Sequence, residues 1–132
     1  MRFLLLFLSI VWLASPAAQA ARPLPTPKLV AVYAYADWCP NCKLFTPEWQ
    51  KVQVQLNSED ILFITFDLTD KPRIHQALML AKTIGLGDYL RAQGSSTGYA
   101  AVLDATTHKE RMRFDRTHTA QQMVERIRQA LE

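Results

Sequence analysis

The sequence has 132 residues, of which 49% are hydrophobic, 20% charged and 10% aromatic, and its formal net charge is +3. This length and composition fit one globular domain and exclude disordered, collagen-like and low-complexity proteins. The near-neutral charge balance gives no broad electrostatic footprint for nucleic acid, so we expect no nucleic-acid partner.

The first segment has the pattern of an export signal. Arg2 gives it a positive start, residues 3–14 form an almost wholly apolar run, and a stretch of small residues ends at Ala18-Gln19-Ala20. A helix that spans a membrane needs about 20 apolar residues, so this run is too short for an anchor. We therefore predict a signal peptide over residues 1–20, and a mature protein in the periplasm or another extracytoplasmic, oxidising compartment.

Residues 21–28 carry proline at alternate positions, namely Pro23, Pro25 and Pro27. Proline removes backbone donors and favours extended geometry, so we predict a Pro-rich leader or short tether here. No internal repeat and no second shift in composition follows this segment. We therefore expect one folded domain over residues 29–132.

Two apolar segments predict buried strands on either side of a helix. Residues 29–36 (LVAVYAYA) and 61–68 (ILFITFDL) have the unbroken apolar character of strands covered on both faces of a mostly parallel sheet. Residues 39–56 have helical spacing between them, with an apolar side made of Leu44, Phe45, Trp49, Val52 and Leu56. Together they predict a strand–helix–strand unit with a right-handed crossover.

The second half predicts further helices and an antiparallel pair of strands. Pro72 suits the first turn of a helix that ends near Gly85, residues 88–92 add a short turn, and residues 94–98 form a loop. Strands at 99–104 and 109–114 are joined by a short turn and so pair antiparallel. Thr119 and Gln122 resemble a capping box that opens a last helix. The order βαβαββα predicts an α/β fold with a central mixed sheet of four strands and helices on both faces.

The chemistry of the chain centres on its two cysteines. Cys39 and Cys42 lie where the first predicted strand gives way to a helix. A thiol at a helix N-terminus meets unpaired N–H groups and the positive end of the helix dipole, so we expect Cys39 to be a nucleophile with a pKa below about 8.5. Cys42 lies one turn further on, is expected to be more buried, and would resolve the mixed disulfide that Cys39 forms with a substrate. Pro40 suits the first helical turn.

Two other interpretations of the pair are an inert disulfide and half of a metal site. A zinc site needs further ligands, but the chain has no other cysteines, and His75, His108 and His118 fall on separate predicted elements. A bridge between residues so close in sequence stabilises a fold little on the entropy model. We therefore favour redox chemistry with no bound metal and no cofactor.

The segment around the cysteines resembles the active site of the thioredoxin superfamily. The similarity runs from Tyr35 to Lys43 (YADWCPNCK) and includes Pro47, and it is closest to the periplasmic thioredoxin-like domain of disulfide reductases. This resemblance implies a thioredoxin-like fold and a thiol–disulfide oxidoreductase, with Trp38 as the family's active-site tryptophan. Proline in the helix interior cannot donate a hydrogen bond, so Pro47 should bend the helix.

The resemblance also implies partners. We expect the domain to act as a monomer on protein thiols and disulfides. We favour reduction over oxidation, and a reductant in an oxidising compartment needs a membrane electron donor. From the motif and the loop before the third strand, we expect Trp38, Pro40, Thr97 and Gly98 to bind substrate.

Two positions depart from the family pattern. The cis-proline expected before the third core strand is replaced by Thr97-Gly98-Tyr99, which predicts looser substrate docking or a site more open to a metal ion. The buried acid expected six residues before the first cysteine is Tyr33, and a phenol with a pKa near 10 is a poor base. A copper- or other metal-binding module that uses the same two thiolates is therefore the alternative function.

Overall fold

The computed structural model describes residues 26–132, which form a four-stranded sheet in the order β2-β1-β3-β4. The strands are β1 (Leu29–Tyr35), β2 (Ile61–Asp67), β3 (Tyr99–Asp104) and β4 (Glu110–Asp115). The helices are α1 (Pro40–Gln55), α2 (Lys71–Thr83), α3 (Gly87–Gln93) and α4 (Ala120–Leu131). The predicted order is confirmed, and the short turn expected at 88–92 is a separate helix, α3. The predicted signal peptide and residues 21–25 of the predicted leader lie outside the described residues.

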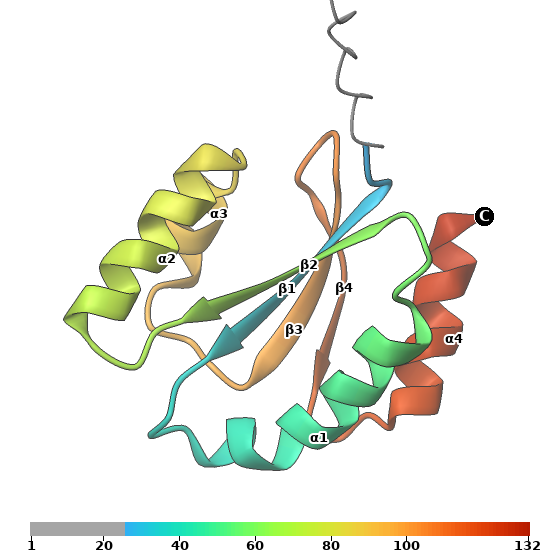
Figure 1. Cartoon of the computed structure of the whole chain (residues 1–132), viewed down its shortest axis with the longest axis horizontal. Coiled ribbons are helices and arrows are strands. Elements are labelled where there is room, and N and C mark those ends of the chain that lie inside the picture. Colours follow the sequence, from blue (N-terminus) through green and yellow to red (C-terminus); the bar gives the residue numbers. More distant parts are fainter. Residues whose placement is uncertain (1–25) are drawn as a thin grey trace, which may run out of the picture.

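The sheet is mixed, as predicted, and β1 lies inside it. β1 pairs in parallel with β2 and antiparallel with β3, which in turn pairs antiparallel with β4. Figure 1 shows α2 and α3 together on one side of the sheet and α1 and α4 together on the other. Because successive side chains of a strand point to opposite faces, Leu29, Ala31 and Tyr33 enter one core and Val30, Val32 and Ala34 the other.

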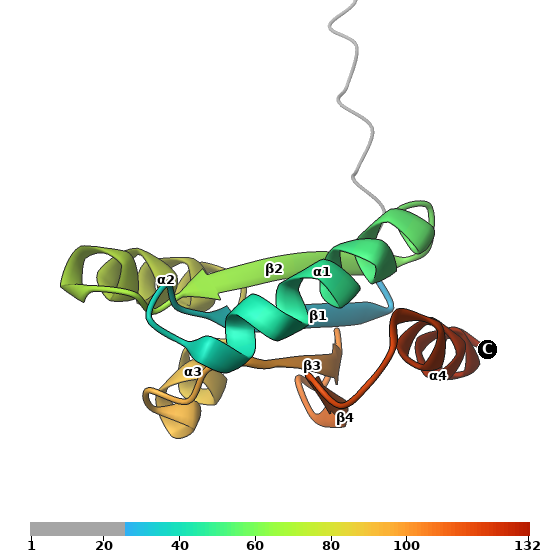
Figure 2. The same cartoon turned by 90° about the horizontal axis from the view of Figure 1, so that it is seen from below.

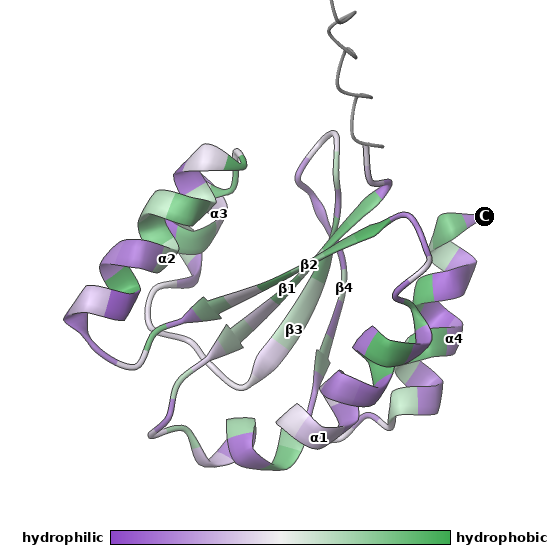
Figure 3. Cartoon of the chain, viewed as in Figure 1, coloured by the Kyte–Doolittle hydropathy of each residue, from purple (hydrophilic) through white to green (hydrophobic). Residues whose placement is uncertain are grey.

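Two apolar cores hold the helices in place. One joins Phe45, Trp49 and Val52 of α1 to Met123 and Ile127 of α4 over one face of the sheet. The other places α2 and α3 on the opposite face through Ala77, Ala81 and Leu90. Figure 2 shows this arrangement from below, and Figure 3 shows hydrophobic residues concentrated along β1 and β2. The two cores fix β1 from both sides, and the cysteine motif follows directly from its end.

Two details of the predicted core are wrong. Leu44 is 63% exposed, because the buried stripe of α1 runs through Cys42, Phe45, Trp49 and Val52. Adjacent helical residues are about 100° apart, so a stripe centred on Phe45 turns Leu44 to the side. The segment 61–68 is also not covered throughout, because β2 is an edge strand and Leu62 is 40% exposed.

The helix ends follow the local sequence. Thr119 caps α4, and its side chain and that of Gln122 form the predicted capping box. Asp70 caps α2 by accepting a hydrogen bond from the backbone N–H of Arg73. Pro47 lies inside α1, and Figure 1 shows the helix axis turning partway along its length. Within residues 26–132, none of the helices combines the length and apolar character that crossing a bilayer requires.

Candidate active site

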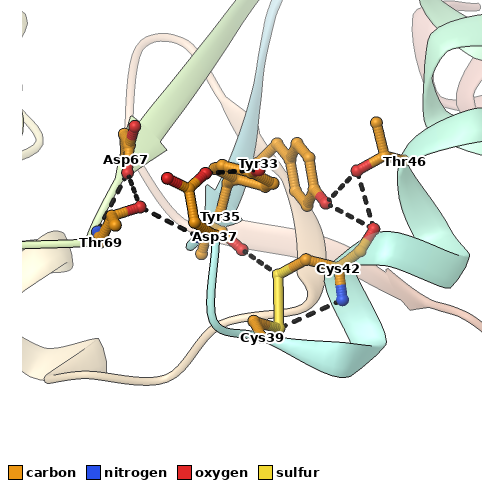
Figure 4. Close-up of a disulfide and its surroundings, with 9 residues drawn as sticks. Tyr33, Tyr35, Asp37, Cys39, Cys42, Thr46, Asp67 and Thr69 are labelled. Atoms are coloured by element: carbon orange, nitrogen blue, oxygen red, sulfur yellow. Dashed lines mark hydrogen bonds between the residues drawn. A yellow bond between two sulfur atoms is a disulfide. The ribbon is translucent and has the colours of Figure 1, made fainter.

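Cys39 and Cys42 lie at the start of α1 and are joined by a disulfide, with their Cα atoms 5.3 Å apart (Figure 4). Cys39 is the N-cap residue, and Pro40 opens the helix as expected for a residue that has no N–H to leave unpaired. The backbone N–H of Cys39 donates to the carbonyl of Ala36 at 3.1 Å, which closes the turn between strand and helix. The fold therefore places the pair where β1 gives way to α1.

The helix start supplies a hydrogen bond to Cys39. The backbone N–H of Cys42 donates to Cys39 Sγ at 3.1 Å, so this sulfur takes the place of an N-cap oxygen. In a reduced protein, the same N–H and the positive end of the helix dipole would favour a thiolate over a thiol. Cys39 is 4% exposed and Cys42 is fully buried, so Cys42 is the more buried of the two, as expected.

The loop before β3 packs directly against the disulfide. Gly98 has φ +83°, and its N–H donates to the carbonyl of Ala34 at 2.9 Å. A Cβ atom on Gly98 would lie 3.3 Å from Cys39 Sγ and 2.9 Å from the Cβ of Asn41. Only glycine fits this approach without strain or displacement. No peptide bond between residues 26 and 132 is cis, and the half-buried Thr97 precedes Gly98 in the same loop.

Trp38, the residue before Cys39, borders a largely apolar pocket. Its side chain is 57% exposed, and its Nε1–H donates to the carbonyl of Thr69 at 3.0 Å. A pocket of about 470 Å³ is lined by Trp38, Leu68 and Ile74, together with residues 69–71 and two residues of the loop after α3, Gly94 and Ser95. The hydrogen bond holds the indole against the connection between β2 and α2, and the indole forms one apolar wall of the pocket.

Beneath Cys42 lies a pair of hydroxyl groups that the sequence patterns did not identify as a unit. The Tyr33 hydroxyl is 2.8 Å from Thr46 Oγ1 and 3.3 Å from the carbonyl oxygen of Cys42 (Figure 4). Burial raises the pKa of Tyr33, while its bond to Thr46 opposes that shift. Thr46 Oγ1 donates to the same Cys42 carbonyl at 2.7 Å. Its position four residues after Cys42 was the available signal, because threonine in a helix often bonds to the carbonyl four residues earlier.

A polar cluster fixes the segment that precedes the cysteines. The N–H of Asp37 donates to Thr69 Oγ1 at 3.0 Å, and the Tyr35 hydroxyl donates to Asp37 at 2.8 Å (Figure 4). The bond to the Asp37 carboxylate raises the pKa of Tyr35. Arg73 of α2 contacts three carboxylates, those of Asp37, Asp67 and Asp70. This cluster attaches the segment that precedes Cys39 to the connection between β2 and α2.

Residues 21–82 match the family model described as Thioredoxin. No curated protein sequence matches the chain at a significant level.

The fold is similar to several solved structures. One is a thiol:disulfide interchange protein of the thioredoxin family from Chlorobium tepidum TLS, with a TM-score of 0.55 and 21% identity over 81% of this chain and 82% of that one. StoA from Bacillus subtilis gives a TM-score of 0.53 and 16% identity over 77% and 84% of the two chains. Thioredoxin-2, a component of the malaria parasite protein secretion machinery, gives 0.53 and 18% over 77% and 82%.

Proposed function

Because this chain carries a thioredoxin-like domain with a close pair of cysteines, we propose that it is a thiol–disulfide oxidoreductase that acts outside the cytoplasm on protein substrates. One observation carries the proposal. Cys39 Sγ is the N-cap of α1 and accepts the N–H of Cys42, with the Cys42 sulfur bonded to it. This arrangement favours an ionised sulfur at Cys39 and keeps a second sulfur within reach of it.

The reductive reaction has two exchange steps. The Cys39 thiolate attacks one sulfur of a substrate disulfide, forms a mixed disulfide and expels the other substrate sulfur as a thiolate. The Cys42 thiol loses its proton to solvent and attacks Cys39 Sγ, which breaks the mixed disulfide and releases the second substrate thiolate. Two electrons pass to the substrate, both released thiolates take up protons from water at neutral pH, and the Cys39–Cys42 disulfide is left.

Substrate docking is assigned to the surface around Cys39. The exposed Trp38 and the apolar pocket that it borders suit an apolar side chain of an unfolded or extended protein segment. Pro40 is exposed at the mouth of the site, and the Thr97–Gly98 loop approaches Cys39 from β3. These contacts would hold a substrate sulfur near Cys39 Sγ.

The direction of electron flow that we propose is reduction. The export-type N-terminus supports an oxidising compartment, where a reductant must be recharged. A membrane electron donor is the partner that such a cycle requires. Recovery of the protein from the periplasm with Ala21 as its first residue would support the location, and an intact N-terminus in the cytoplasm would contradict it.

A redox titration tests the function. The mature chain, residues 21–132, is equilibrated with glutathione buffers, and the Cys39–Cys42 couple is followed by thiol alkylation. We expect reversible cycling, a potential near the reducing end of about −270 mV, and insulin reduction that Cys39→Ser abolishes. A potential near −120 mV would contradict the reductive direction. Tight stoichiometric binding of Cu(I) without disulfide turnover would replace the enzyme by a metal-binding module.

A further inference from the structure

Tyr33 stands in the middle of β1 with its hydroxyl at the first turn of α1. The ring is buried among aromatic neighbours, with centroids 5.6 Å from Phe45, 5.8 Å from Tyr35 and 6.4 Å from Trp49. This packing fixes the ring, so the hydroxyl meets Thr46 and Cys42 as Figure 4 shows. The packing of the ring therefore fixes the position of the Tyr33 hydroxyl.

The two hydroxyls form a directed chain that ends on the carbonyl of Cys42. Each hydroxyl has one proton to donate. Thr46 Oγ1 is 2.7 Å from the Cys42 oxygen, and the Tyr33 hydroxyl is closer to Thr46 Oγ1, at 2.8 Å, than to that oxygen, at 3.3 Å. The distances therefore assign the Thr46 proton to Cys42 and the Tyr33 proton to Thr46.

This pair of hydroxyl groups lies next to a gap in the hydrogen bonding of α1. Pro47 has no N–H, so the carbonyl of Lys43 lacks the helical donor that it would otherwise meet. That missing bond lies one residue beyond Cys42. A pocket of about 490 Å³, lined in part by Tyr33, Thr46 and Pro47, opens on this side of the turn, so packing around Thr46 is incomplete. The hydroxyl chain supplies an anchor at this point.

We propose that Tyr33 is a positioning residue that acts through Thr46 to hold Cys42 in the place from which its sulfur closes on Cys39. The inference rests on the proposed function, because it concerns the second exchange step. In that step the Cys42 sulfur forms a bond with Cys39 Sγ while the bond from Cys39 Sγ to the substrate sulfur breaks. A loosened turn lowers the effective concentration of Cys42 at Cys39 Sγ.

The test is the equilibrium between the Cys39–Cys42 couple and glutathione. Tyr33→Phe keeps the aromatic ring and removes the hydroxyl. Loss of one hydrogen bond predicts a fall of about fivefold in the equilibrium constant for closing the disulfide, which makes the potential about 20 mV less negative. The mixed disulfide between Cys39 and glutathione should accumulate in the same variant, because its resolution slows.

A double-variant cycle separates this role from general destabilisation. Thr46→Val removes the second hydroxyl, and because the two act as one chain, the pair of substitutions should shift the potential no further than Thr46→Val alone. Tyr89→Phe is the matched control, since the Tyr89 hydroxyl donates to Glu110, on the strand β4. It should leave the potential unchanged.

The outcomes distinguish the two proposals. If the wild-type couple does not cycle, the proposed function fails and the inference fails with it. If the wild type cycles while Tyr33→Phe keeps its potential and resolves the mixed disulfide at the wild-type rate, the positioning role alone is overturned. Should Tyr33→Phe not fold, Thr46→Val carries the test, and a wild-type potential in that variant overturns the role.

Discussion

Gly98→Ala is the substitution that most directly probes the packing of the β3 loop on the disulfide. The new Cβ would lie 2.9 Å from Asn41 Cβ and 3.3 Å from Cys39 Sγ, in a backbone conformation with φ +83°. Backbone strain of this kind costs about 1–3 kcal/mol. Crowding in a packed site adds about 1–3 kcal/mol. We expect the free energy of unfolding of the oxidised protein to fall by about 2–6 kcal/mol.

The reactivity of Cys39 should change with the stability. To relieve the contact, the loop or the start of α1 must move, and misplacement of a reacting group by about 1 Å can reduce a rate 100-fold. We therefore expect insulin reduction by Gly98→Ala to fall at least about tenfold. Urea unfolding measures the stability, and iodoacetamide alkylation of the reduced protein measures the reactivity of Cys39.

Gly94→Ala is the control for backbone strain. Gly94 also has a positive φ, +60°, but a Cβ atom there would meet nothing within 4 Å. This variant should lose stability through strain while the alkylation rate of Cys39 stays at the wild-type value. Wild-type alkylation and turnover in Gly98→Ala would refute the contact between this loop and the reacting sulfur.

Three further predictions concern the cysteines, the docking surface and the β3–β4 turn. Cys42→Ser should trap a mixed disulfide on Cys39, visible by mass spectrometry, whereas Cys39→Ser should form none. Trp38→Ala should lower kcat/KM for a protein disulfide about tenfold and leave Cys39 alkylation unchanged, because it removes a docking wall rather than the nucleophile. The pKa of Asp104 is lowered from 3.8 because the N–H groups of Thr107 and Thr106 donate to it. Ionised Asp104 therefore stabilises the fold fully above about pH 4, and this stabilisation is lost as the pH falls through the lowered pKa. Asp104→Asn should reduce the loss of stability at acid pH, which urea unfolding at several pH values measures.

The features of the site that depend on residues close in sequence were predictable. Cys39, Pro40 and Cys42 are close in sequence, and a helix start after an apolar strand determines their relation to the helix dipole. The capping box at Thr119 is local in the same way, and the structure contains it. Short-range patterns therefore sufficed for the cysteine pair and for the order of the elements.

Contacts that depend on the tertiary fold escaped the sequence patterns. The bond between Tyr33 and Thr46 joins residues of β1 and α1 that meet only once the helix has packed on the sheet. Arg73 and Asp37 are 36 positions apart and become neighbours through the β2–α2 connection. The exposure of Leu62 follows from strand order, because an apolar run looks the same whether it becomes an inner or an edge strand.

The place of β2 at the margin of the sheet has a practical consequence for handling the protein. Among residues 26–132, this strand forms a backbone ladder with β1 alone, so N–H and C=O groups along its outer side have no strand partner there. Unpaired edge strands of this kind are where protein molecules begin to aggregate at high concentration. Lysine in place of Leu62, which is 40% exposed, is the change that we would make to keep samples dispersed.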